Sequence, residues 1–409
     1  MQPSPGFAPG MLLTKLNAAR EETDKLFSVI RAGSIYERPV AQRHRLIFYL
    51  GHLEAFDWNQ IAAGQLPADR FNPTFDKLFE AGIDPDSNSL PTDRPSDWPS
   101  LYEVHSYCKR VRREMDLLLP KADERVVHTA IEHRLMHAET LAYLMHSMPF
   151  DQKSAPGLGP MPVSTVSVER PVTIPAGVAT LGRKRGRSFG WDNEFDEHRV
   201  EVPRFSIDRH KVTNRQYQVF VRDGAPPPHF WTKERGRWYC RGMFGLAPLA
   251  LDAPVYVTQQ EAAAYAKWAG KSLLSESQFH RAAYGARGGI EREYPWGSAD
   301  PLHSHGNFDF QYWDPISVNA TPAGDSGFGV SQLVGNGWEW TSTVFAPFPG
   351  FHADSNYPGY SANFFDGEHY VLKGASPRTA ACFLRRSFRN WFRADYPYVF
   401  ATFRCVENE

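Results

Sequence analysis

The chain has 409 residues, which predicts two domains, and its 42% hydrophobic and 22% charged residues exclude wholesale disorder. Its 45 basic and 46 acidic side chains give a net charge of −1, so no nucleic-acid partner is expected, and no apolar run approaches the roughly 18 residues that predict a membrane span. Met1–Gly10 lacks a signal-peptide pattern, and the scattered Cys108, Cys240, Cys382 and Cys405 indicate reduced thiols of a cytoplasmic protein.

The first 150 residues have the period of amphipathic helices. Apolar residues recur at helical spacing in Met11–Ala32 and in Pro39–Ala63. A polar stretch, Asp84–Pro99, separates these segments from two more, Ser100–Leu119 and Ala122–His146. Four such helices with one long connection predict a four-helix bundle as the first domain, residues 1–150.

The second half has a different pattern. Residues 151–163 have the Pro/Gly-rich composition of a linker. Beyond them we expect β-type runs and short helices: strands in Ser164–Ile174, His198–Ile207 and His369–Lys373, helices in Asn214–Arg222 and Thr258–Trp268, and a candidate third helix in Glu276–Tyr284. Most Trp residues lie in stretches that we interpret as loops, such as Gly335–Trp340. Residues 164–409 therefore predict a loop-rich α+β domain.

Three histidines of the helical half are candidate metal ligands. His133 and His137 are spaced i, i+4, so they project from one helix face and offer two imidazoles to one metal. His52, in the middle of the second predicted helix, is a third, and Gly51 beside it lets another segment or a ligand approach closely. Three neutral imidazoles suit iron, zinc or copper. A catalytic zinc hydrolase is therefore one alternative, and ordinary surface or core histidines are another.

The helical half resembles the DinB-like bundle of the nonheme-iron sulfoxide synthases of ergothioneine biosynthesis. In that family a His of the second helix and an H-x-x-x-H pair of the fourth hold Fe(II). His52 matches the first, and His133 and His137, within Glu132–Thr140, match the pair. The resemblance implies Fe(II) as cofactor and O2 as cosubstrate. We expect the three histidines to bind one iron at the floor of a cleft between the two domains.

The second half is similar to the formylglycine-generating-enzyme fold, which is C-type-lectin-like. The matching stretches are Phe205–Phe220, Pro254–Ala283, Tyr294–Gly297, Gly335–Ser342, Val371–Gly374 and Phe388–Arg404. Formylglycine-generating enzymes work through a C-terminal cysteine pair that binds copper. Cys382 and Cys405 stand far apart in this chain, which argues against activity on a protein substrate.

The family resemblance implies an oxidative coupling of two small molecules. Hercynine (N-α-trimethylhistidine) gains a bond from a chalcogen donor at the imidazole carbon between the two nitrogens. Tyr357 matches the family's proton-donating Tyr, although a loop Tyr that only packs is the alternative. Tyr360 matches a second Tyr that lines the pocket, and Trp391 matches an aromatic residue suited to a quaternary ammonium. We interpret Asn336 and Glu339 as structural, either calcium ligands or hydrogen-bond anchors.

The chain departs from the family where the thiol donor binds. Family members that use γ-glutamylcysteine carry an Asp and an Arg where this chain has Phe392 and Tyr396, and an Arg pair in the loop where Gly82–Pro91 has none. Met136 replaces a Gln near hercynine. Because charge-assisted hydrogen bonds contribute about 1.5–3 kcal/mol each, a zwitterionic donor would bind far more weakly.

These departures resemble the selenoneine synthase branch, which takes selenium from a selenosugar. An ergothioneine-type synthase with a thiol donor is the alternative within the family. A noncatalytic metal-binding sensor module is the alternative of another class, and the retention of Tyr357 disfavours it.

Overall fold

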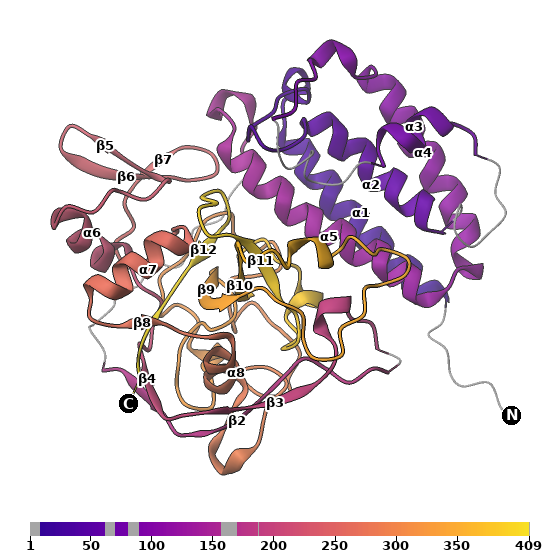
Figure 1. Cartoon of the computed structure of the whole chain (residues 1–409). Helices are drawn as coiled ribbons and strands as arrows, with labels where there is room; N and C mark the ends of the chain where they lie inside the picture. Colours follow the sequence, from indigo (N-terminus) through magenta and orange to yellow (C-terminus); the bar gives the residue numbers. More distant parts are fainter. Residues whose placement is uncertain (1–8, 62–69, 81–89, 157–169, 187, 409) are drawn as a thin grey trace, which may run out of the picture. The chain divides into compact units, whose positions relative to one another are not determined.

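The chain divides into two compact units, Met1–Leu158 and Gly159–Glu409 (Figure 1). The structure, a computed structural model, describes residues 9–61, 70–80, 90–156, 170–186 and 188–408. The predicted linker lies partly outside this set, at residues 157–163, as do residues 82–89 of the loop without arginine and residues 164–169 of the first expected strand. No helix among the described residues is long and apolar enough to cross a membrane.

The first unit is a helical bundle, as the sequence predicts. Its helices are α1 (Pro9–Val29), α2 (Leu46–Ile61), the short α3 (Pro73–Leu78), α4 (Leu101–Leu118) and α5 (Glu124–Ser147). The long helix α1 packs on α5, and α2 packs on both α4 and α5 (Figure 1). Nearly every residue of α2 is buried, which places its side chains in the interior on all faces.

Two features of the bundle differ from the expectation. The second helix begins at Leu46 and not at Pro39, because the preceding chain folds back and the Leu46 N–H donates to the Glu37 carbonyl. The short helix α3 was not predicted. Its N-cap is Asn72, whose side chain accepts from the Phe75 N–H, and Pro73 stands at the first helical position.

The second unit is a mixed α+β domain rich in loops, which confirms the predicted class. One sheet has the order β1-β4-β13-β8, with β1 (Val172–Ile174), β4 (Phe205–Ile207), β13 (Cys405–Asn408) and β8 (Ser272–Leu273). It joins the start of the unit to its end. A second sheet has the order β11-β10-β9-β12, with β11 (Asn390–Arg393), β10 (His369–Ala375), β9 (Gly337–Val344) and β12 (Ala401–Thr402).

Two smaller sheets and three helices complete the second unit. The smaller sheets pair β2 (Gly177–Leu181) with β3 (His198–Val202), and β5 (Trp231–Glu234) with β6 (Arg237–Arg241) and β7 (Leu246–Pro248). The helices are α6 (Asn214–Arg222), α7 (Gln259–Trp268) and α8 (Glu276–Tyr284), close to their predicted bounds. Each begins at a capping box, in which side chains at the N-cap and three residues later satisfy orphan N–H groups.

Three sequence interpretations of this unit need correction or refinement. The expected run His198–Ile207 is two strands, since the chain leaves β3 before Pro203, which has no N–H, and enters a different sheet as β4. The stretch Gly335–Trp340 is not a loop throughout: β9 begins at Gly337 and buries its tryptophans. Glu339 of this strand accepts from Lys211 (2.8 Å) and Arg404 (2.8 and 2.9 Å), so it anchors hydrogen bonds and its charge is already balanced without calcium.

Candidate active site

The helical unit brings together the three histidines that the sequence singles out. His52 projects from α2, and His133 and His137 project from α5. The Nε2 atom of His137 lies 3.2 Å from that of His52 and 3.1 Å from that of His133. The three rings are 0–3% exposed. Within the described residues, they are the one group of three or more His, Cys, Asp or Glu side chains whose ligand atoms all lie within 4.8 Å of one another.

The approach of Phe79 to Gly51 orients the ring of His52. A Cβ on Gly51 would lie 2.5 Å from the Phe79 ring, so only glycine lets the two segments pack this closely. The Phe79 carbonyl then accepts a hydrogen bond of 2.7 Å from Nδ1 of His52. A carbonyl can only accept, so Nδ1 carries the proton and the Nε2 lone pair points toward His137. A metal-binding histidine is commonly oriented in this way, by a hydrogen bond from the ring nitrogen that does not bind the metal.

The three imidazoles are neutral at pH 7. Burial lowers the pKa of His52 to about 4, although its bond to the Phe79 carbonyl works in the opposite direction. Burial also lowers the pKa of His133 and of His137 well below the ordinary value of 6.5, and neighbouring imidazoles add to this effect. The neutral form is the one that binds metals.

The separations of the ring nitrogens fit a single metal ion. Nitrogens about 2.1 Å from one ion lie about 3.0 Å apart at octahedral angles and about 3.4 Å apart at tetrahedral angles. The two observed separations, 3.1 and 3.2 Å, fall between these limits. The group therefore has the chemistry and the spacing of a three-histidine metal site.

Aromatic side chains surround the imidazoles. The ring of Phe56 stacks on that of His133, with centroids 3.4 Å apart, and the ring of Phe48 stacks on that of His52 at 4.9 Å. Such an apolar shell keeps protons and bulk water from the nitrogens. Met136, the candidate for contact with hercynine, lies on α5 beside His137 and is half-buried.

In the second unit, four aromatic residues form what we call the Tyr357 cluster. It comprises Trp191, Tyr357, Tyr360 and Trp391. Trp191 stacks on Tyr360 with centroids 4.0 Å apart, and the Tyr360 ring lies 5.8 Å from Tyr357 and 5.3 Å from Trp391. Tyr357 and Trp391 are half-buried, whereas Tyr360 and Trp191 are buried. The structure thus brings three of the predicted site residues together.

Polar contacts hold the loop that carries Tyr357 and Tyr360. Asp192 accepts from the Ser361 hydroxyl at 2.6 Å and from the Asp354 N–H at 3.4 Å, so it contacts the loop at both ends. Two residues on, the buried Glu194 accepts from Arg385 at 2.5–3.1 Å. Burial raises the pKa of Asp192, although its hydrogen bonds oppose this shift.

Phe392 and Tyr396, which stand where the family carries Asp and Arg, lie in a separate group. We call it the Phe392 cluster, and it comprises His229, Phe392, Tyr396 and Tyr398. The rings of Phe392 and Tyr396 stack with centroids 5.3 Å apart, and Tyr398 lies 5.2 Å from Tyr396 and 5.1 Å from His229. Phe392 follows Trp391 directly on β11, so the two side chains project from opposite faces of the sheet. Because β11 is an edge strand, both faces border the same edge.

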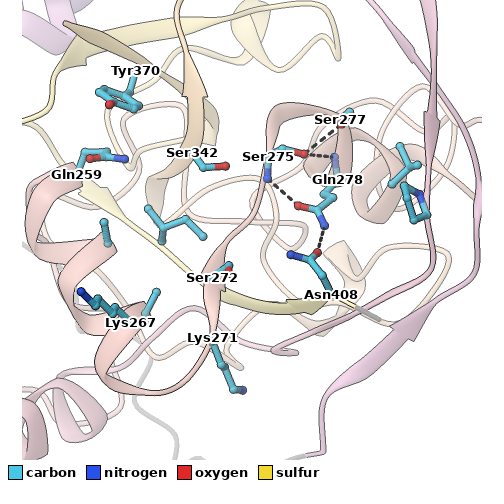
Figure 2. A pocket seen from close by; sticks show the side chains of 15 residues that line it. Gln259, Lys267, Lys271, Ser272, Ser275, Ser277, Gln278, Ser342, Tyr370 and Asn408 are labelled. Atoms are coloured by element: carbon cyan, nitrogen blue, oxygen red, sulfur yellow. Dashed lines mark hydrogen bonds between the residues drawn. The ribbon is translucent and has the colours of Figure 1, made fainter.

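An open hollow of about 720 Å³ lies on the second unit (Figure 2), and one of its lining residues, Tyr370 of β10, pairs across the sheet with Phe392 of β11. None of the predicted site residues lines it. Its polar groups bond one another or their neighbours. The Ser275 N–H donates to Gln278, whose amide donates to Asn408 at 2.8 Å (Figure 2). Lys271 pairs with Asp208, which lies outside the lining. These internal bonds satisfy groups that a ligand would otherwise use, so we assign no role to the hollow.

Several residues at the site were not predicted. Phe56 follows His52 by four residues on the same helix, so the helical period could have found it. Trp191 and Asp192 have no such signal, because they lie at the start of the short 3-10 helix Asp192–Glu194, about 165 residues before the loop that they contact.

Comparison with known proteins shows the family. Residues 159–409 match the model of the sulfatase-modifying factor enzyme 1-like domain. The hercynine oxygenase of Mycolicibacterium smegmatis is 34% identical over 357 residues, which cover 80% of this chain and 81% of that protein. The chain belongs to the hercynine oxygenase family.

Two further relatives match this family member over part of their length. The hercynine oxygenase of Mycobacterium tuberculosis is 39% identical over 239 residues, 53% of this chain and 55% of that protein. Ergothioneine biosynthesis protein 1 of Neurospora crassa is 27% identical over 91% of this chain and 55% of its own length. The chain thus spans about half the length of these two relatives.

Proposed function

We propose that this chain is an O2-dependent nonheme-iron enzyme that joins a chalcogen donor to hercynine, and that the donor is a selenosugar. The observation that carries the iron-enzyme part is the group of three buried imidazoles, in which Nε2 of His137 lies 3.2 and 3.1 Å from Nε2 of His52 and His133, in a member of the hercynine oxygenase family. Named relatives in ergothioneine biosynthesis support hercynine as the acceptor. They also disfavour a zinc hydrolase and a noncatalytic sensor.

The reaction has a simple balance. A carbon–hydrogen bond of the imidazole and the Se–H (or S–H) bond of the donor break, and a carbon–selenium (or carbon–sulfur) bond forms. Four electrons leave the substrates if one oxygen atom of O2 stays on the chalcogen and the other leaves as water with the two hydrogens. Bound Fe(II) would supply the O2 chemistry that no side chain can perform.

The protein's own residues would bind, orient and protonate. His52, His133 and His137 would hold the iron on one side, with the remaining positions for substrates. Tyr357 would keep a proton on its phenol and donate it during turnover, a role that requires the phenol to reach the substrate. Trp391 and Tyr360 would contact the trimethylammonium of hercynine, which has charge but no N–H to donate.

The choice of donor rests on the Phe392 cluster. Two stacked rings, Phe392 and Tyr396, occupy positions at which γ-glutamylcysteine-using relatives of the family carry opposite charges. Aromatic faces bind the apolar face of a sugar, and the Tyr396 and Tyr398 hydroxyls offer hydrogen bonds to its hydroxyl groups. A selenol is more acidic than a thiol, whose pKa is about 8.5, so the selenosugar reaches the iron as an anion at neutral pH.

A competition assay tests the proposal. The Fe(II)-loaded protein is incubated in air with hercynine and equal concentrations of a 1-selenosugar, its 1-thio analogue, γ-glutamylcysteine and cysteine, and the products are identified by mass. We expect the selenosugar adduct to dominate. Equal or faster use of γ-glutamylcysteine or cysteine would overturn the donor assignment alone. No adduct of hercynine with any donor would overturn the proposed enzyme.

A further inference from the structure

A buried ion network joins the two helices that carry the three histidines. Arg134 of α5 is fully buried. Its guanidinium donates to both carboxylate oxygens of Glu54 (2.9 and 3.1 Å), to Asp57 (2.6 Å) and to the backbone carbonyl of Leu53 (3.1 Å). Glu54, Asp57 and Leu53 all belong to α2, so one side chain makes four contacts across the α2–α5 interface.

The network lies next to the histidines in sequence, but Arg134 projects from α5 in a different direction from His133. Arg134 follows His133 directly, and Leu53 follows His52 directly. Successive residues of a helix differ in direction by about 100°, so Arg134 points about 100° away from His133. The contact to the Leu53 carbonyl links Arg134 to the backbone of α2, and a backbone carbonyl cannot shift unless the helix itself shifts.

The network continues to the other two long helices. Arg112 of α4 donates to Glu54 at 2.8 Å and to Asp24 of α1 at 2.6 and 2.7 Å. Every long helix of the bundle therefore contributes to one connected set of charges around Glu54.

Stability alone is a weak reason for such a network. Replacing a buried ion pair by apolar side chains of similar volume is often neutral or favourable for folding, because desolvating the charges offsets their attraction. What the charges supply is a unique register. Metal–ligand distances tolerate changes of only about 0.2 Å, whereas one residue of helix rise is about 1.5 Å. A small slip of α2 along α5 would therefore separate His52 from the other two ligands.

We propose that Arg134 is a positioning residue, which with Glu54 and Asp57 sets the register of α2 against α5 so that the three imidazoles meet in metal-binding geometry. The inference rests on the metal-binding part of the proposed function. It is independent of the donor and of Tyr357.

The test measures metal binding and not turnover. Co(II) serves as the probe, because its visible bands report ligand number and geometry, and its dissociation constant is obtained by competition with a chelator. The variants are Arg134→Met, Arg134→Lys and Asp57→Asn in the full chain. The matched control is Arg20→Met. Arg20 is also buried (4% exposed), and its charge also acts on Glu54 and Asp57, but its hydrogen bond to Asp116 at 2.6 Å joins α1 to α4, which carry no ligand. Thermal unfolding of each metal-free variant is recorded in parallel.

We expect Arg134→Met to weaken Co(II) binding by about 10–100-fold, the range for residues that orient metal ligands, and to change the visible bands. Arg134→Lys should recover part of the loss, and Asp57→Asn should lose less than Arg134→Met. Arg20→Met should keep wild-type affinity and bands. Should Arg134→Met fail to fold, the other two variants still report on the register.

Three results would contradict the inference. One is wild-type Co(II) affinity and visible bands in both single variants, Asp57→Asn and Arg134→Lys. Another is an equal loss in Arg20→Met, which would indicate general loosening of the bundle. A third is a loss of affinity that follows the loss of thermal stability across all the variants. His137→Ala separates the two proposals: if it leaves Co(II) binding unchanged, the metal site itself is wrong, and with it the proposed function.

Discussion

The two units hold their candidate residues in different ways. In the helical unit, His52, His133 and His137 stand on regular helices, are almost completely buried and lie beside a network of charges that joins these helices. In the second unit, Tyr357 stands on irregular backbone and is half-buried. A rigid helical frame suits a metal, which demands fixed distances, whereas loops on a scaffold suit substrate recognition, which differs between family members.

Loss of the Tyr357 hydroxyl should slow the reaction more than any other change in the second unit. In Tyr357→Phe the ring and its packing remain but the proton is gone, so coupling should slow by about 10²–10⁴-fold, the usual contribution of a general acid. Oxidation of the donor without coupling should increase. Rates and product ratios are measured by mass, with Tyr102→Phe, an 81% exposed residue of α4, as the control. Unchanged turnover and product ratio would mean that Tyr357 only packs.

Loosening the loop should cost less than removing the acid. Asp192→Ala removes the acceptor for Ser361 and for the Asp354 N–H, and a displacement of about 1 Å at a reacting group can cost up to about 100-fold in rate. We expect kcat to fall in this variant while Co(II) affinity stays unchanged. A parallel loss of metal affinity would show that the two units do not hold their residues independently.

Charges restored in the Phe392 cluster should change the choice of donor. Each charge-assisted hydrogen bond contributes about 1.5–3 kcal/mol, or roughly 10–150-fold in affinity. The double variant Phe392→Asp, Tyr396→Arg should therefore raise KM for the selenosugar and admit γ-glutamylcysteine. The control is Arg393→Met on the same strand β11, which removes a surface ion pair with Glu368, the residue just before β10. Equal donor preference in the double variant and the control would remove Phe392 and Tyr396 from the donor site.

The smallest expected effect is a local change in the helical unit. In Gly51→Ala the new methyl would lie 2.5 Å from Phe79, and overpacking of this kind costs about 1–3 kcal/mol of folding free energy. Relief of the clash moves the carbonyl that orients His52, so Co(II) affinity should fall as well. Thermal unfolding and chelator competition measure the two effects. Wild-type metal affinity in a destabilised Gly51→Ala would mean that Phe79 does not orient His52.

The same contrast explains what could be predicted from the sequence. The pair His133 and His137 was recognised because helical periodicity reports directly which residues share a face. The meeting of this pair with His52 depends on the register of two helices, which periodicity does not report. The position of His52 in the middle of a neighbouring helix made it a candidate, and the family resemblance then matched it to a ligand. The Arg134 network could not be predicted for the same reason, because Glu54 and Asp57 lie about 80 residues before Arg134 in the sequence.

The second unit was less predictable. Its class and three helices were predicted, but many of its short strands were not, and the roles of Tyr357 and Tyr360 stay predictions. Strand β9 follows Gly335 and Asn336, both with positive φ, so its start looks like a turn. Trp391 and Phe392, predicted together as substrate contacts, fall in different clusters because adjacent strand residues face opposite sides. Had the sequence shown that both residues lie within one strand, the alternation of side chains would have assigned them to opposite faces.

The most direct test of the central claim is the position of iron in the loaded protein. Anomalous diffraction at the iron edge from crystals of the Fe(II)-loaded full chain, grown without O2, locates the metal independently of any assumed ligand. The account predicts one peak within about 2.0–2.3 Å of the Nε2 atoms of His52, His133 and His137. A peak elsewhere, or one bound by only two of these histidines, would contradict it.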